Sequence, residues 1–68
     1  MAWSSLANVL GSSPDLKSTA NALTWLQQNK DSLVSDVGSS EYNKMYNTIL
    51  DMRQKYYDSV RAATHSTQ

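Results

Sequence analysis

The sequence predicts a small all-α protein: an antiparallel helical hairpin of residues 14–37 and 41–63, with a short N-terminal helix at residues 2–10. Three observations support this fold class. Apolar residues recur at helical spacing in each segment, a glycine follows each of the first two segments, and the loops between segments have about four residues or fewer. We expect a single domain over residues 1–68, in which residues 64–68 form a disordered polar tail.

The first segment, residues 2–10, is predicted to be a short amphipathic helix. One face carries Trp3, Leu6, Ala7 and Leu10. Glycine follows directly, and it enters the left-handed backbone region that ends many helices without steric cost. The polar face carries Ser and Asn rather than Lys or Arg, which favours packing against protein over contact with a membrane surface.

The second segment, residues 14–37, begins after Ser13, a good N-cap residue, with Pro14 at the favoured first helical position. Its apolar arc consists of Leu16, Ala20, Leu23, Leu26, Val34 and Val37. Lys30 interrupts this arc and follows Asn29, a residue that can cap a helix. Whether the segment forms one helix or two therefore stays open, and we favour one helix that bends near Lys30.

The third segment, residues 41–63, has the broadest apolar face in the chain. We expect Ser39 or Ser40 to cap it, with Glu41 in the first turn complementing the helix dipole. At 100° per residue, one arc holds Met52, Met45, Ala63, Tyr56, Ile49, Tyr42, Val60, Tyr46, Tyr57 and Leu50. Because this arc covers about half of the circumference, more than one packing seam needs, we expect the helix to meet more than one neighbour.

The composition limits how much stability a core can supply. A chain of 68 residues buries only about 60 % of the surface that its unfolded form exposes, and Leu, Ile, Val and Phe together number 12. There is no Cys for a disulfide. Helical periodicity and zero net charge argue against disorder. We therefore expect association to stabilise the fold, as a homo-oligomer or as a subunit of a larger assembly.

No residue pattern points to catalysis, a metal or a cofactor. A nucleophilic triad needs a histidine held beside its nucleophile, and His65 lies in the predicted polar tail. Asp51 and Asp58 lie on a polar face, where basic neighbours at i+3 and i+4 make ordinary surface pairs. One histidine without cysteine cannot form a usual zinc site, and the glycines form no phosphate-binding loop. We expect a non-enzymatic protein with no cofactor and no small-molecule substrate.

Aromatic residues and one arginine form the candidate partner interface. Arg53 falls near the centre of the broad arc, where burying its charge unpaired would cost several kcal/mol. Either its stem packs while the guanidinium reaches solvent, or a tyrosine or a partner meets it. Tyr and Trp also need hydrogen-bond partners when they are covered, and Tyr, Trp and Arg are enriched at interface hot spots. The candidate interface consists of Trp3, Trp25, Tyr42, Tyr46, Arg53, Tyr56 and Tyr57.

Charge and hydropathy disfavour nucleic acid and membranes as partners. Six basic and six acidic residues leave zero formal net charge, which gives no field to attract an anionic surface. No apolar run approaches the roughly 18 residues of a membrane span, and no signal-peptide pattern is present. We expect a protein that is soluble as synthesised. The sequence does not define its location, although 25 Ser, Thr, Asn and Gln residues suit a virion protein.

These features favour a small structural or adaptor subunit of a larger repeated assembly, such as a phage or virus particle, that works by protein–protein contact. Two other classes of protein fit the same sequence. One is a monomeric inhibitor or regulator that binds a single macromolecular target. The other is a membrane-active peptide that uses residues 1–10, and it would gain helicity on addition of lipid vesicles.

Overall fold

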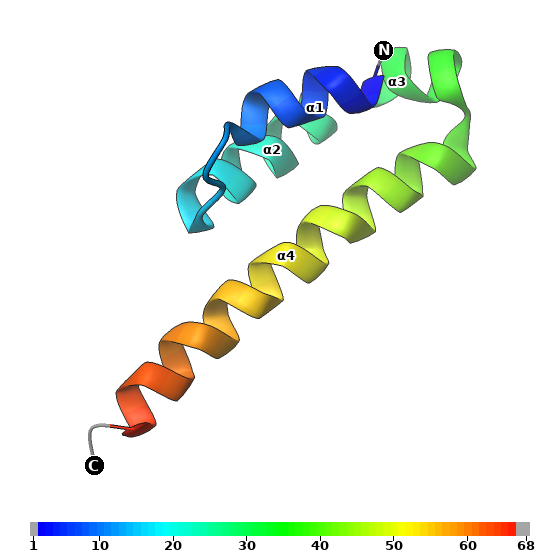
Figure 1. Ribbon diagram of the computed structural model, residues 1–68. Helices are drawn as coiled ribbons and strands as arrows, with labels where there is room; N and C mark the ends of the chain where they lie inside the picture. The colour runs from blue at the N-terminus through cyan, green and yellow to red at the C-terminus, as the bar shows by residue number, and fades with distance from the viewer. Residues whose placement is uncertain (1, 67–68) are drawn as a thin grey trace.

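The protein is all-α, as predicted. The computed structural model describes residues 2–66, and this range contains four helices and no strand (Figure 1). The helices are α1 (Ala2–Leu10), α2 (Leu16–Gln28), α3 (Lys30–Val37) and α4 (Ser39–Ser66). With 28 residues, α4 is the longest of them.

Helix α1 ends where the sequence predicts. Gly11 has a φ of 79°, and its N–H donates to the Ala7 carbonyl oxygen at 3.0 Å. The backbone thus leaves the helix through a left-handed residue that satisfies one of the free carbonyl groups of the last turn.

Helix α2 begins two residues later than predicted, and Asp15 rather than Ser13 is its N-cap. The Asp15 carboxylate accepts a hydrogen bond from the Ser18 N–H at 2.8 Å, and the Ser18 hydroxyl accepts one from the Asp15 N–H at 2.8 Å. This reciprocal pair satisfies two backbone donors at once. Pro14 therefore lies before the helix instead of in its first turn.

The expectation of one bent helix over residues 14–37 is wrong in detail, because Asn29 separates α2 from α3. The Trp25 carbonyl oxygen accepts two bonds from Asn29, one from the backbone N–H at 3.0 Å and one from the side-chain amide at 2.8 Å. Helical hydrogen bonding then starts again directly in α3, since the Leu33 N–H donates to the Asn29 carbonyl at 2.9 Å. An asparagine side chain that competes for backbone groups thus interrupts the helix for a single residue.

Helix α4 is longer than predicted at both ends. Gly38, at a φ of 90°, ends α3, and its carbonyl oxygen accepts the Tyr42 N–H at 3.0 Å, so α4 starts at Ser39. The helix continues through Ser66 without a glycine or proline to stop it. The tail predicted for residues 64–68 is therefore helical over 64–66, and residues 67 and 68 lie outside the described range.

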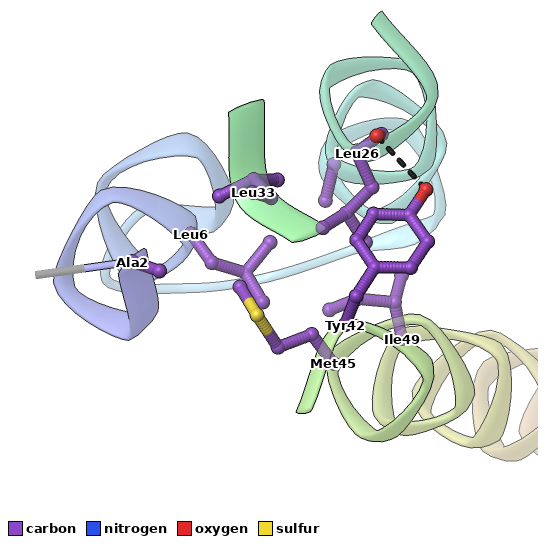
Figure 2. Close-up of a cluster of buried hydrophobic side chains, with 8 residues drawn as sticks. Ala2, Leu6, Leu26, Leu33, Tyr42, Met45 and Ile49 are labelled. Carbon is purple, nitrogen blue, oxygen red and sulfur yellow. Dashed lines mark hydrogen bonds between the residues drawn. The ribbon is translucent and has the colours of Figure 1, made fainter. Parts of the chain in front are cut away.

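All four helices contribute to one small core, which Figure 2 shows around the first turns of α4. The buried apolar residues are Ala2, Leu6, Ala22, Leu26, Leu33, Tyr42, Met45 and Ile49. Helix α1 packs on α2, and both α2 and α3 pack on α4. The three α4 members of the core lie within residues 42–49, near the N-terminal end of the helix.

The C-terminal half of α4 extends beyond this core, toward the red end of the ribbon in Figure 1. The molecule measures 50 × 21 × 15 Å, and its radius of gyration is 13.9 Å, against about 11 Å for a compact chain of this length. The predicted hairpin is therefore asymmetric: α2 and α3 form one arm, and the longer arm, α4, projects past it.

Candidate functional site

The two tryptophans of the predicted interface have partners within the chain. Trp3 is 39 % exposed, and its Nε1 donates to the Glu41 carboxylate at 2.7 Å, which joins α1 to the start of α4. Trp25 is half-buried and packs against the core cluster. Neither ring is a fully exposed anchor for another protein.

Tyr42 is a core residue rather than a surface residue, which removes it from the candidate interface. It is only 5 % exposed, and its hydroxyl donates to the Leu26 carbonyl oxygen at 2.9 Å, the dashed line in Figure 2. Burial raises the pKa of its phenol above the ordinary value of 10.0, because the phenolate would lose its hydration. Tyr42 thus fastens the end of α2 to the start of α4.

Tyr46 and Tyr56 are half-buried and bind the neighbouring arm of the hairpin. The Tyr46 hydroxyl accepts a hydrogen bond from the Gln27 amide at 2.9 Å. The Tyr56 hydroxyl donates to the Pro14 carbonyl oxygen at 2.5 Å, so it holds the loop that precedes α2. Together the two hydroxyls attach both ends of α2 to α4.

Arg53 has its charge satisfied inside the fold. Its Nη1 donates to the Leu16 carbonyl oxygen at 2.7 Å and to the Thr19 hydroxyl at 3.1 Å. Its Nη2 donates to the Tyr57 hydroxyl at 3.0 Å, and its Cζ lies 5.6 Å from the Tyr57 ring centroid. Thr19 is fully buried, and its hydroxyl also donates to the Asp15 carbonyl at 2.9 Å. A partner carboxylate is therefore not needed to stabilise Arg53.

The large apolar side chains left exposed on α4 are Leu50, Tyr57 and Val60, at 44, 46 and 57 %. Of these, only Tyr57 belongs to the interface predicted from the sequence. Leu50 and Val60 belong to the predicted arc, but periodicity alone does not say which part of an arc another helix covers. That depends on where α2 begins, which the contacts of Arg53 and Tyr56 determine.

These exposed residues belong to a second stripe along α4, which we call the α4 seam. The seam consists of Tyr46, Leu50, Arg53, Tyr57, Val60 and Thr64. The spacing alternates between four and three residues, the a/d repeat by which one helix packs along another. A parallel stripe of Tyr42, Met45, Ile49, Met52 and Tyr56 faces the fold. The broad arc is therefore two adjacent seams, one packed against the fold and one largely open.

The open seam borders a shallow groove at the start of α2. The groove has a volume of about 380 Å³ and is lined by Asp15, Leu16, Lys17, Tyr56, Ser59 and Val60. Asp15 forms its acidic rim, and the pKa of this carboxyl is lowered chiefly by the hydrogen bond from the Ser18 N–H. Val60 belongs to both the groove and the seam, so the two surfaces adjoin at this residue.

Within residues 2–66, no group of three or more His, Cys, Asp or Glu side chains is placed to hold a metal ion. None of the helices described in this range is long and apolar enough to cross a membrane. Comparisons of the chain with protein-family models, with curated proteins and with solved structures found no significant match.

Proposed function

We propose that this protein is a non-enzymatic helical module that acts by protein–protein contact, as a structural or adaptor subunit of a larger repeated assembly. The observation that carries the proposal is the α4 seam, which leaves Leu50, Tyr57 and Val60 exposed on a helix that projects from the core. Scattered exposed apolar residues are normal on soluble proteins. Three on one a/d stripe form a surface that a second helix can cover.

The shape of the molecule supports the same proposal. Its accessible surface is 4739 Å², against about 4,300 Å² for a compact protein of this mass. The excess agrees with an α4 whose last turns extend past the start of α2 (Figure 1). Within the chain α4 already meets α2 and α3, and a partner along its last turns would cover the part of the apolar arc that these two helices leave exposed.

Assembly into a repeated particle, such as a phage or virus particle, is the more specific part of the proposal. It is supported by the small core, the neutral charge and the many Ser, Thr, Asn and Gln residues. A monomeric regulator would use the same α4 seam against a different protein. The membrane-active alternative has less support, because Ala2 and Leu6 of α1 are buried in the core.

The native mass of the protein tests this proposal. Size exclusion with light scattering, at concentrations from about 10 µM to about 1 mM, would measure the mass while circular dichroism follows helicity. We expect species larger than the monomer that dissociate on dilution. A helical monomer at every concentration would contradict the structural-subunit proposal and would favour the monomeric regulator.

A further inference from the structure

Building on the proposed function, we infer that the α4 seam is covered by the same seam of a second copy of this chain, packed in the antiparallel direction. An interface of this kind has two-fold symmetry, so each copy offers the other the same surface. The inference rests on how the residues of the seam match in one register and on the charges beside them.

The seam is complementary to itself when the two helices run in opposite directions. In a register centred on residue 55, Leu50 lies opposite Val60 of the second copy, and Arg53 lies opposite Tyr57 of the second copy. The first layer places an apolar side chain against another. The second places a guanidinium against a tyrosine ring, a pair that is favourable and that Arg53 and Tyr57 already form within one chain at 5.6 Å.

The parallel direction is less favourable for the same residues. It places Arg53 opposite Arg53 of the second copy, and two like charges in a partly desolvated layer repel each other. It also separates Asp51 from Arg61 of the second copy by about 15 Å, the rise of ten residues. In the antiparallel register these two exposed residues come within two residues of the same level along the paired helices, at both ends of the interface.

The part of α4 that the other helices of the same copy cover also favours the antiparallel direction. Within each copy, α2 and α3 pack on α4 as far as the residues that meet the start of α2, Arg53 and Tyr56, and only the last turns project past it (Figure 1). Antiparallel pairing brings these last turns beside the folded body of the second copy, so each body covers the end that the other leaves open. The groove next to Val60 then receives the Leu50 region of the second copy.

Single-cysteine variants test the direction of pairing. Because the wild-type chain has no cysteine, every disulfide must join the introduced residues. Leu50→Cys and Val60→Cys would be purified separately, mixed in equal amounts in a glutathione redox buffer, and analysed by mass spectrometry. Both side chains are exposed in the monomer, so the variants should remain folded, which circular dichroism checks. We expect the mixed disulfide to exceed either homodisulfide by about tenfold.

Thr48→Cys mixed with Lys55→Cys is the matched control, since both residues are exposed on the opposite face of α4. This pair should give the mixed disulfide and the two homodisulfides in the proportions expected from random encounter. A preference for the Leu50→Cys homodisulfide would overturn the antiparallel direction. Random products from the seam pair, while the wild-type protein still assembles, would overturn self-pairing through the seam and leave the proposed function standing. A wild-type monomer at every concentration would overturn both.

Discussion

The Arg53 guanidinium lies 2.7 Å from the Leu16 carbonyl oxygen and joins the middle of α4 to the first turn of α2. The same group donates to Thr19 and to Tyr57, so one side chain links the two arms of the hairpin and borders the open seam. Because it fixes where α2 begins along α4, this contact determines which part of α4 is covered and which part projects.

We expect Arg53→Lys to lower the free energy of unfolding by about 1–3 kcal/mol, because a single ammonium cannot reach the Leu16 carbonyl and the Tyr57 hydroxyl together. Urea unfolding followed by circular dichroism would measure the change. Arg61→Lys, at an exposed position on the same helix, is the control and should stay within about 0.5 kcal/mol of wild type. Equal effects of the two substitutions would show that Arg53 does not link the arms.

Asp15 should make stability depend on acid pH. Hydrogen bonding from the Ser18 N–H lowers its pKa in the folded chain below the ordinary value of 3.8. The folded chain therefore binds the proton less readily than the unfolded chain. This contribution to stability is complete above the unfolded-state pKa and is lost as pH falls through the lowered pKa.

The substitution that tests this is Asp15→Asn, which keeps a capping side chain but has no carboxyl group to titrate. The midpoint of urea unfolding would be measured at about pH 5 and at about pH 2. The decrease between these two pH values should be larger for wild type than for the variant. The same decrease in both proteins would mean that the Asp15 cap does not contribute to the acid sensitivity.

Tyr42→Phe should cost about 1 kcal/mol of stability at neutral pH, because it removes the bond from the buried hydroxyl to the Leu26 carbonyl. It should also make the protein more resistant to alkali. Since burial raises the pKa of Tyr42, its contribution is present below the unfolded-state pKa and is lost as pH rises through the raised value.

Unfolding midpoints at increasing pH, with absorbance recording tyrosine ionisation, would measure this effect. Tyr57→Phe is a control with an exposed ring. If the wild-type protein and Tyr42→Phe lose stability equally above about pH 10, the buried phenol is not the group responsible.

Adjacent residues on α4 should differ sharply in their effect on stability. Ile49 is fully buried, so Ile49→Ala should lower the free energy of unfolding by about 2–5 kcal/mol, enough to unfold much of so small a protein. Leu50 is 44 % exposed, and Leu50→Ala measured in the dilute monomer should cost far less. Thermal unfolding of both variants at low concentration compares them. Similar losses would place Leu50 in the core.

The features predicted correctly from the sequence are those that depend on local chemistry. Gly11 and Gly38 both adopt positive φ at helix ends, as glycine does most readily, and α1 ends where Gly11 requires. The start of α2 was misplaced because Ser13 and Asp15 are both good N-cap residues. The signal that distinguishes them is Ser18, three residues after Asp15, which completes the reciprocal capping pair.

The candidate interface could be predicted only in part. Periodicity located Arg53 and the tyrosines on one arc, but several of their partners are backbone carbonyls of Pro14, Leu16 and Leu26. A carbonyl is common to every residue, so no sequence pattern marks it as a partner. The exposure of Leu50 and Val60 could not be predicted either. Which residues of α4 other helices cover depends on packing between segments distant in sequence.

The most direct test of the α4 seam as a contact surface is sedimentation equilibrium of the wild-type protein beside Leu50→Glu/Val60→Glu. The control, Thr48→Glu/Ala62→Glu, adds the same charge on the opposite, exposed face of α4. We expect the wild-type protein and the control to associate as concentration rises, and the seam variant to stay a helical monomer. Association of the seam variant equal to that of wild type would contradict the proposed contact surface.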